Sequence, residues 1–191
     1  MSLFDALLGR DKPLKSKLDN LFGLSTAELT LATEFDLTPT NAAAVSFRRV
    51  SSGEFARLET EINDLLQAST KDSPLQWHSY TDNFGYQWII VQAEEFSNLV
   101  ATMHMISLEL QDGGYGEQLL ASVFQYRSVR TGQNVYWIYN YKRGTFYPFV
   151  PTGKQDRDNA FEMRLNAIMS LELECERDLT KWYALWGIPL T

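Results

Sequence analysis

The sequence predicts an α+β fold, a single domain in which helices pack on an antiparallel sheet of about five strands. Amphipathic helical patterns alternate along the chain with pairs of short extended runs. The two runs of each pair are separated by only a few turn residues, which permits antiparallel pairing, whereas parallel strands need a long crossover. Helices that cover one antiparallel sheet form the α+β arrangement.

The size and composition of the chain are those of one globular domain. It has 191 residues, of which 45% are hydrophobic and 21% charged. A compact chain of this length buries roughly 70% of its unfolded surface, so its core needs no metal or disulfide to hold it together. We expect residues 21–191 to form the α+β domain and residues 1–20 to form an N-terminal amphipathic and basic segment.

Three helices are predicted from apolar stripes with a helical period. The first is opened by a capping box at Ser51, the second spans about residues 95–111 and is ended by a glycine pair, and the third takes Asp158 as its N-cap. Residues 178–191 are predicted to pack as a further short helix, because their tryptophans would otherwise be exposed. Residues 24–40 show only a loose pattern and receive no element.

Strands are predicted where short runs are rich in aromatic and β-branched residues. These runs are residues 43–49, 76–80, 86–92, 118–127 and 133–141, with 145–149 as a further extended segment. The stretch YKRGTFYPFVP (residues 141–151) indicates a hairpin whose turn is Lys142-Arg143-Gly144. Pro148 cannot donate to a strand ladder, so the segment that contains it is predicted to be an edge strand or a strand end.

Charge and motif spacing argue against nucleic-acid binding. The net charge is −7 and the isoelectric point is about 4.9, so the overall field repels phosphate. Arg143 and Gly144 match the start of an RNA-recognition consensus. Thr145, however, stands where that consensus requires a base-stacking aromatic residue. We therefore expect no nucleic-acid partner.

The residues that metal sites and nucleophilic catalysis require are few. The single cysteine, Cys175, lies among acidic residues that raise a thiol pKa, and a lone cysteine agrees with a reducing cytoplasm. The two histidines do not have zinc-site spacing, and His104 is interpreted as a packed or rim histidine. The acidic series at residues 172–178 is interpreted as a solvated face. We expect no metal, no cofactor and no catalytic residue.

The N-terminal stretch combines an apolar helical face with cations. A short amphipathic helix followed by basic residues can lie on an anionic membrane surface. A flexible arm, or a helix docked on the core, is the alternative. The predicted membrane contacts are Leu3, Phe4, Leu7, Leu8, Arg10 and Lys12. No run of the chain reaches the roughly 18 apolar residues that a membrane span requires.

Several segments together resemble a known family. They are MSLFDALLGR at the start, DNFGYQW, YKRGTFYPFVPTG followed by RDNAFEMRL, and DLTKWYALWGIPL at the end. In this order, from residue 1 to about residue 190, the chain resembles the PspAB family of PspA-associated proteins of bacteria and archaea. The resemblance implies an accessory role in the phage-shock membrane-stress response, with PspA or a membrane metalloprotease of the HtpX type as partners. It carries over no catalytic residue.

We therefore expect a non-enzymatic adaptor in the cytoplasm, bound to a protein partner and in peripheral contact with the inner face of the membrane. Turn geometry does not require two cations at the hairpin tip, so the predicted partner-binding residues are Lys142, Arg143, Tyr147 and Arg157. Three alternatives stay open. They are a homodimer formed through an exposed edge at Pro148, a chaperone-like binding module of another pathway, and an enzyme with an unrecognised site built on Asp82 and Arg157.

Overall fold

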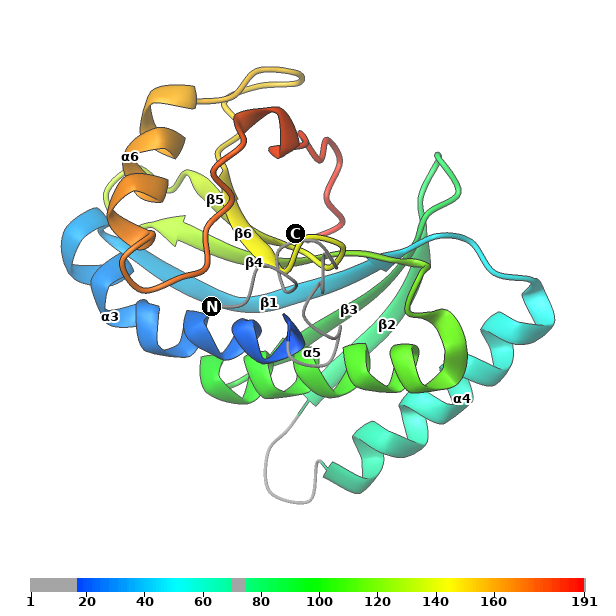
Figure 1. The fold of residues 1–191 in the computed structure, drawn as a ribbon. Coiled ribbons are helices and arrows are strands. Elements are labelled where there is room, and N and C mark those ends of the chain that lie inside the picture. Colours follow the sequence, from blue (N-terminus) through cyan, green and yellow to red (C-terminus); the bar gives the residue numbers. More distant parts are fainter. Residues whose placement is uncertain (1–16, 70–74, 191) are drawn as a thin grey trace, which may run out of the picture.

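The computed structural model describes residues 17–69 and 75–190. A six-stranded antiparallel sheet with the order β2-β3-β1-β4-β5-β6 forms its centre (Figure 1). The predicted α+β class is confirmed, with six strands in place of about five. The strands are β1 (Leu37–Phe47), β2 (Leu75–Thr81), β3 (Gln87–Ala93), β4 (Leu119–Ser128), β5 (Asn134–Asn140) and β6 (Thr145–Phe149).

Four α-helices accompany the sheet in the described ranges, and three of them were predicted. The helices are α3 (Gly23–Phe35), α4 (Ser52–Ser69), α5 (Phe96–Leu110) and α6 (Asn159–Met169). The capping box of α4 is present, because Glu54 Oε2 accepts from the backbone N–H of Ser51 at 3.1 Å. Asp158 caps α6 by accepting from the N–H of Phe161 at 2.9 Å. Gly114, with φ 89°, lies in the π-helical turn that follows α5, as the glycine pair indicated.

Helix α3 occupies part of the stretch that received no element. Its buried residues, Leu24, Ala27, Leu31 and Phe35, recur every three or four positions, which is a helical stripe. Threonines on its other positions weaken the helical preference, because they are β-branched. The chain then turns at Asp36, which has a left-handed φ of 54°, and continues directly into β1.

The prediction of a short C-terminal helix is wrong. Only a 3-10 turn, η3 (Leu179–Lys181), forms in the tail, which then continues without regular structure. Gly187 has φ 76° and Pro189 follows, and both interrupt a helix. The tail still buries Trp182 and Leu190 against the sheet, so the argument that its apolar residues must be covered is confirmed.

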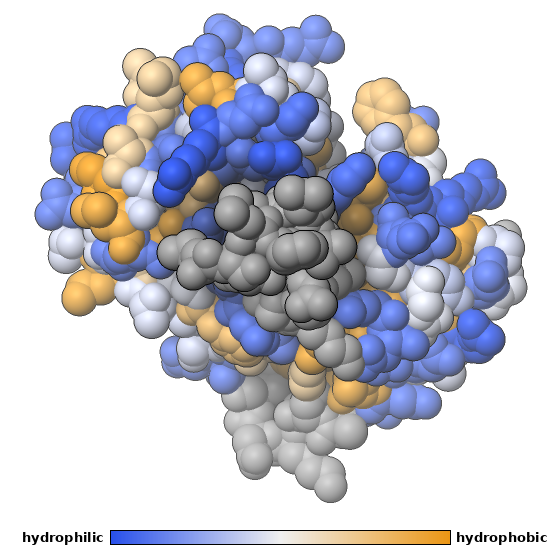
Figure 2. Space-filling model, viewed as in Figure 1, coloured by the Kyte–Doolittle hydropathy of each residue, from blue (hydrophilic) through white to orange (hydrophobic). Residues whose placement is uncertain are grey.

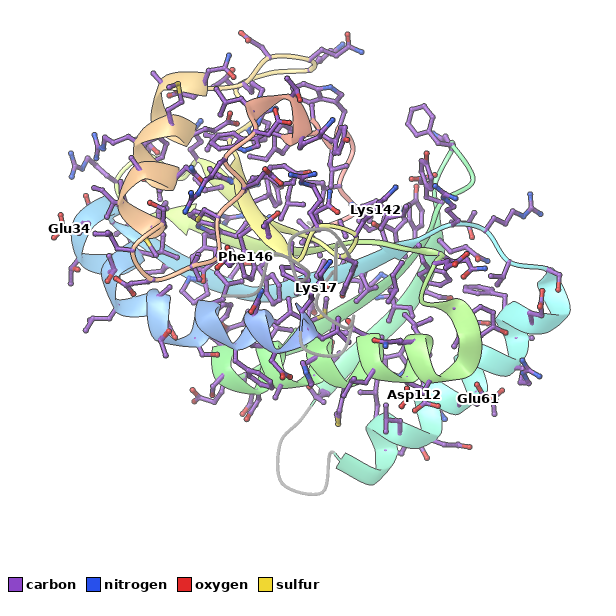
Figure 3. The ribbon with its side chains drawn as sticks, viewed as in Figure 1. Lys17, Glu34, Glu61, Asp112, Lys142 and Phe146 are labelled. Atoms are coloured by element: carbon purple, nitrogen blue, oxygen red, sulfur yellow. The ribbon has the colours of Figure 1, made fainter. Side chains whose placement is uncertain are left out.

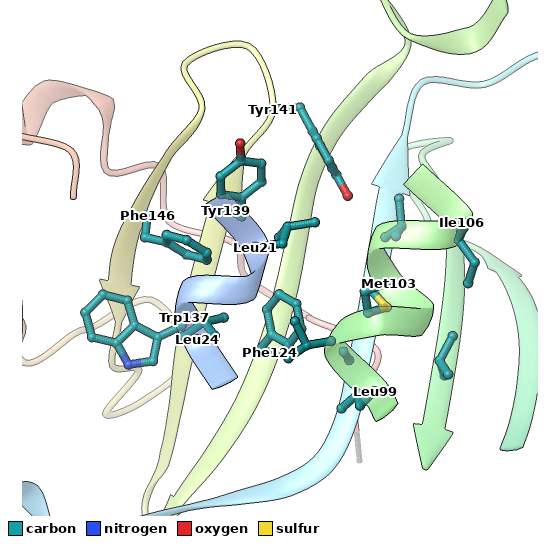
Figure 4. Close-up of a cluster of buried hydrophobic side chains, with 14 of the residues drawn as sticks. Leu21, Leu24, Leu99, Met103, Ile106, Phe124, Trp137, Tyr139, Tyr141 and Phe146 are labelled. Atoms are coloured by element: carbon teal, nitrogen blue, oxygen red, sulfur yellow. The ribbon is translucent and has the colours of Figure 1, made fainter. Parts of the chain in front are cut away.

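Both faces of the sheet are buried over most of β1 and β3 to β6, each by a different part of the chain, whereas one face of β2 is exposed. Helices α3 and α5 lie across one face (Figure 1). There Leu24 and Met103 from the helices meet Phe124 and Trp137 from the strands (Figure 4). On the other face the C-terminal tail packs on the alternate strand residues, including Val123, Ile138 and Tyr147. Strands with two buried faces leave the edges of the sheet as the places where its backbone groups can reach solvent.

Candidate partner-binding surface

The turn between β5 and β6 forms the predicted hairpin tip, which comprises residues 141–144. Gly144 has φ 73°, and its N–H donates to the carbonyl of Asn140 at 2.7 Å. A side chain at this position would also collide with its neighbour, since an added Cβ would lie 3.0 Å from the side chain of Lys17. Glycine is therefore required here by both the backbone conformation and the close approach of Lys17.

Lys142 is the exposed cation of this tip. Figure 3 shows it on the same side of the molecule as Lys17. Within residues 17–69 and 75–190, no carboxylate lies at ion-pair distance from Lys142. Contacts among these residues therefore do not use its charge.

Arg143, the second cation of the tip, is held by a buried carboxylate. Its Nε donates to Glu176, and its Nη2 donates to the same carboxylate at 3.1 Å. The Thr145 hydroxyl at 3.1 Å and the Asp178 amide at 2.9 Å complete the set of donors. Burial opposes the charge of Glu176, but these donors hold its pKa below the ordinary value. The interpretation of residues 172–178 as a solvated face is therefore wrong for Glu176, which is 3% exposed.

Arg157 is also committed to the fold. Its Nε donates to the two carboxylate oxygens of Glu162 at 2.9 and 2.8 Å, and its Nη1 donates to the carbonyl of Trp182 at 3.0 Å. Its guanidinium lies 5.0 Å from the centre of the Phe149 ring. Burial raises the pKa of Glu162 above its ordinary value, and Arg157 acts in the opposite direction. Arg157 thus joins α6, β6 and the tail.

Tyr147 points into the face that the tail covers. Its side chain is 2% exposed, its hydroxyl donates to the carbonyl of Tyr183 at 3.1 Å, and burial raises its pKa. Of the four predicted partner-binding residues, only Lys142 and the half-exposed Arg143 lie together at the surface. The predicted membrane contacts, Leu3 to Lys12, lie outside the described residues.

The outer edge of β6 is closed at Phe146 by a following segment of the chain. The N–H of Phe146 donates to the carbonyl of Glu174 at 2.8 Å, and the N–H of Glu176 donates to the carbonyl of Phe146 at 2.7 Å. Both backbone groups of Phe146 therefore face away from β5 and are satisfied. Because outward and inward residues alternate along a strand of an antiparallel pair, Pro148 faces the same way.

Pro148 and Val150 continue this closed edge. The missing N–H of Pro148 falls on the outer side, so it costs the β5–β6 ladder nothing, and its carbonyl accepts from Arg157 Nη2 at 3.4 Å. The N–H of Val150 donates to Glu162 Oε1 at 2.7 Å, and its carbonyl accepts from the N–H of Asp158 at 2.9 Å. The prediction that β6 is an edge strand is confirmed, but the exposed edge expected at Pro148 is covered.

The structure separates the residues of the alternative enzyme site. Asp82 lies after β2, where its carboxylate accepts from the N–H groups of Phe84 and Tyr86 and from Trp88 Nε1. Arg157 packs beside β6, at the opposite edge of the sheet. A hollow of about 280 Å³ lies beside Phe149, the ring on which Arg157 packs, and its lining also includes Lys154 and Trp186.

The cysteine and His104 pack against neighbouring residues of the fold. Burial raises the pKa of the Cys175 thiol to about 12, with Glu174 adding to the rise, so the predicted direction is confirmed and burial is its larger cause. His104 Nε2 lies 3.1 Å from Asp19 Oδ1, and its ring packs on Phe22. Over the described ranges, no group of three or more histidine, cysteine, aspartate or glutamate residues is arranged to hold a metal ion. In the same ranges no helix is long and apolar enough to cross a membrane.

Sequence reasoning did not find Glu162 and Glu176, the two carboxylates that hold the arginines. Glu162 lies only five residues after Arg157. A glutamate on the buried side of a helix and close to an arginine in sequence is a weak indication of such an ion pair. Glu176 is 33 residues from Arg143, so no local pattern connects the pair.

These features define a single-domain α+β protein whose candidate site is a surface hairpin, with its neighbouring arginines used to close a sheet edge. The chain belongs to the family described as PspAB, PspA associated protein B, whose model matches residues 1–190. Family membership confirms the resemblance seen in the sequence. Comparison with curated proteins and with solved structures found no significant match.

Replacing Arg157 with alanine should destabilise the protein strongly. The change leaves the Glu162 carboxylate buried without its partner, and breaking a buried pair in this way costs about 3–5 kcal/mol. Lys142→Ala, the matched control at an exposed cation, should change the free energy of unfolding by less than about 0.5 kcal/mol. Urea denaturation measures both. Equal, small effects of the two substitutions would show that Arg157 does not hold the edge.

The stabilising effect of Glu176 should depend on pH. Its folded-state pKa is lowered, so its contribution is present above the unfolded pKa of about 4.3 and is lost as pH falls through the folded pKa. The difference in unfolding free energy between wild type and Glu176→Gln should therefore be largest near neutral pH and shrink under acid. Glu174→Gln, at an exposed neighbouring position, is the control. A difference that stays constant down to acid pH contradicts the assignment.

Proposed function

We propose that this protein is a non-enzymatic adaptor that binds PspA in the envelope-stress response. The observation that carries the proposal is membership, over residues 1–190, of a family described by its association with PspA. We further propose that the protein acts at the cytoplasmic side of the membrane, which is what the family resemblance implies. A membrane protease of the HtpX type, as a second partner, stays a prediction from the resemblance.

The hairpin tip is the surface that we assign to PspA. The conformation of the turn explains Gly144 and the Glu176 carboxylate explains Arg143, but neither explains Lys142. Arg143 is fixed by Glu176, so the tip presents Lys142 on a rigid support, and a preorganised contact loses little conformational entropy on binding. A cationic tip complements an acidic patch on its partner, and complementary charge contributes mainly to the association rate and to specificity.

Charge reversal at the tip should weaken binding to PspA. We expect Lys142→Glu to raise the Kd of purified PspA about tenfold, which corresponds to about 1.4 kcal/mol, without changing the unfolding midpoint. Lys154→Glu makes the same charge change at another exposed lysine and should leave the Kd within about twofold. Isothermal titration calorimetry measures all three proteins. No binding of PspA by wild type would refute the proposed function, and equal effects of the two reversals would refute the assignment to the tip.

We also propose that residues 1–12 contact the membrane surface. Deletion of these residues should abolish co-sedimentation with vesicles of anionic phospholipid, because both the apolar face and the cations Arg10 and Lys12 are removed. The unfolding midpoint of the deletion variant should match that of the full chain. Vesicles of zwitterionic phosphatidylcholine are the control and should bind neither protein. Undiminished sedimentation of the deletion variant with anionic vesicles would refute this contact.

A further inference from the structure

Strand β2 is the other edge of the sheet, and it pairs only with β3. The N–H of Asp82 donates to the carbonyl of Tyr86 at 2.9 Å, so this pair of the β2–β3 hairpin is hydrogen-bonded. Because bonded and non-bonded pairs alternate in an antiparallel ladder, the backbone groups of Trp77, Ser79 and Thr81 point away from β3. In the part of the chain that the structure describes, these outward groups have no hydrogen-bond partner.

The β2 edge lacks the devices that usually prevent strand addition. Natural edge strands carry lysine, other charged residues, proline or a bulge, or they are covered by another segment. The sequence of β2, LQWHSYT, contains no lysine, arginine, acid or proline, and its register with β3 is continuous. The β6 edge differs in both respects, because it contains Pro148 and is covered by later segments of the same chain.

The surroundings of β2 are acidic. The neighbouring helix α4 holds four acidic residues, Glu54, Glu59, Glu61 and Asp64, and one basic residue, Arg57. Helix α4 brings part of this charge to the edge, because Glu59 accepts a hydrogen bond from the Ser79 hydroxyl. The visible surface over α4 is mostly hydrophilic (Figure 2). A cationic segment is therefore attracted to this edge, and an acidic one is repelled.

A hollow of about 270 Å³ lies where α4 meets the end of β2. Val50 and Phe55 give it an apolar wall, and the carboxylate of Glu59 gives it an acidic group. The apolar wall accepts the aliphatic stem of a lysine or arginine side chain, whose charged end then meets Glu59. Arg49 also lines the hollow, so the preference for a cation rests on Glu59 and on the acidic face of α4. The complete lining is Arg49, Val50, Phe55, Ala56, Glu59, Thr81 and Gln87.

We propose that the β2 edge binds an extended, basic segment of a partner protein by strand addition. The backbone groups of Trp77, Ser79 and Thr81 pair with the main chain of the incoming segment, which supplies affinity in this mode of recognition. Its side chains alternate between the faces of the sheet. Cationic side chains on one face meet Glu59 and α4, and apolar side chains on the other face meet Tyr80, which is 42% exposed. This inference goes beyond the proposed function, because it requires neither PspA nor Lys142.

The direct test uses a synthetic peptide of nine residues in which lysine and valine alternate, with a fluorescent label. Binding is measured by fluorescence anisotropy against the full-length protein. A peptide with glutamate in place of lysine is the charge control and should bind at least tenfold more weakly. Absence of binding by the lysine peptide, or equal binding of the two peptides, overturns the proposal.

Two substitutions at one position separate the backbone contact from the side-chain contact. Ser79→Pro removes an outward N–H, which an edge strand tolerates, and should weaken lysine-peptide binding at least tenfold. Ser79→Ala removes only the hydroxyl bonded to Glu59 and should bind within about threefold of wild type. Circular dichroism establishes that both variants are folded. If folded Ser79→Pro binds as wild type does, the peptide does not occupy the edge.

Amide hydrogen exchange of wild type locates the peptide without any substitution. The peptide should slow exchange at Trp77, Ser79 and Thr81, whose N–H groups point outward, and leave His78 and Tyr80 unchanged, because these already donate to β3. Slowing confined to the β5–β6 hairpin would overturn the proposal. A concentration-dependent dimer of wild type that Ser79→Pro dissociates would also overturn it, because the edge would then be occupied by a second copy of this chain.

Discussion

The hydrogen-bond requirement of the sheet edges is the constraint on which the rest of this structure depends. A buried N–H or carbonyl without a partner costs free energy comparable to a lost hydrogen bond, and both faces of this sheet are covered over most of β1 and β3 to β6. The β6 edge is closed from within the chain, by the segment around Cys175 and by the side chains of Arg157 and Glu162. The position of α6 and of the C-terminal tail follows from this closure, since Arg157 contacts both.

The closure of the β6 edge gives a structural role to the arginines that follow β5. The sequence predicted that Arg143 and Arg157 bind a partner. In the structure, each is bound to a buried glutamate of the same chain. The charge left over for a partner is that of Lys142, at a tip made rigid by the Arg143–Glu176 pair. Over the described residues the open edge lies at β2, on the far side of the sheet and beside the acidic helix α4. The proposed cationic contact and the proposed strand-accepting contact are thus separated by the width of the sheet.

The local parts of this arrangement could be predicted from sequence, and the long-range parts could not. The hairpin turn at Gly144 and the edge position of Pro148 follow from the chemistry of single residues, as do the capped starts of α4 and α6. Helix α3 was missed because its threonines obscure a real apolar stripe. The burial of Glu176 and the covered edge at Phe146 depend on segments about 30 residues away, and a period or a motif carries no information about such pairings.

Over the described residues, one edge of the sheet is closed by the chain and the other is open, and amide hydrogen exchange of the free protein tests this difference most directly. The N–H groups of Phe146 and Val150 should exchange slowly, because both are bonded within the fold. Those of Trp77 and Ser79 should exchange far faster, although they also lie in an edge strand. Equal protection of the two pairs, or faster exchange at Phe146 than at Ser79, would contradict the assignment of the closed and the open edge.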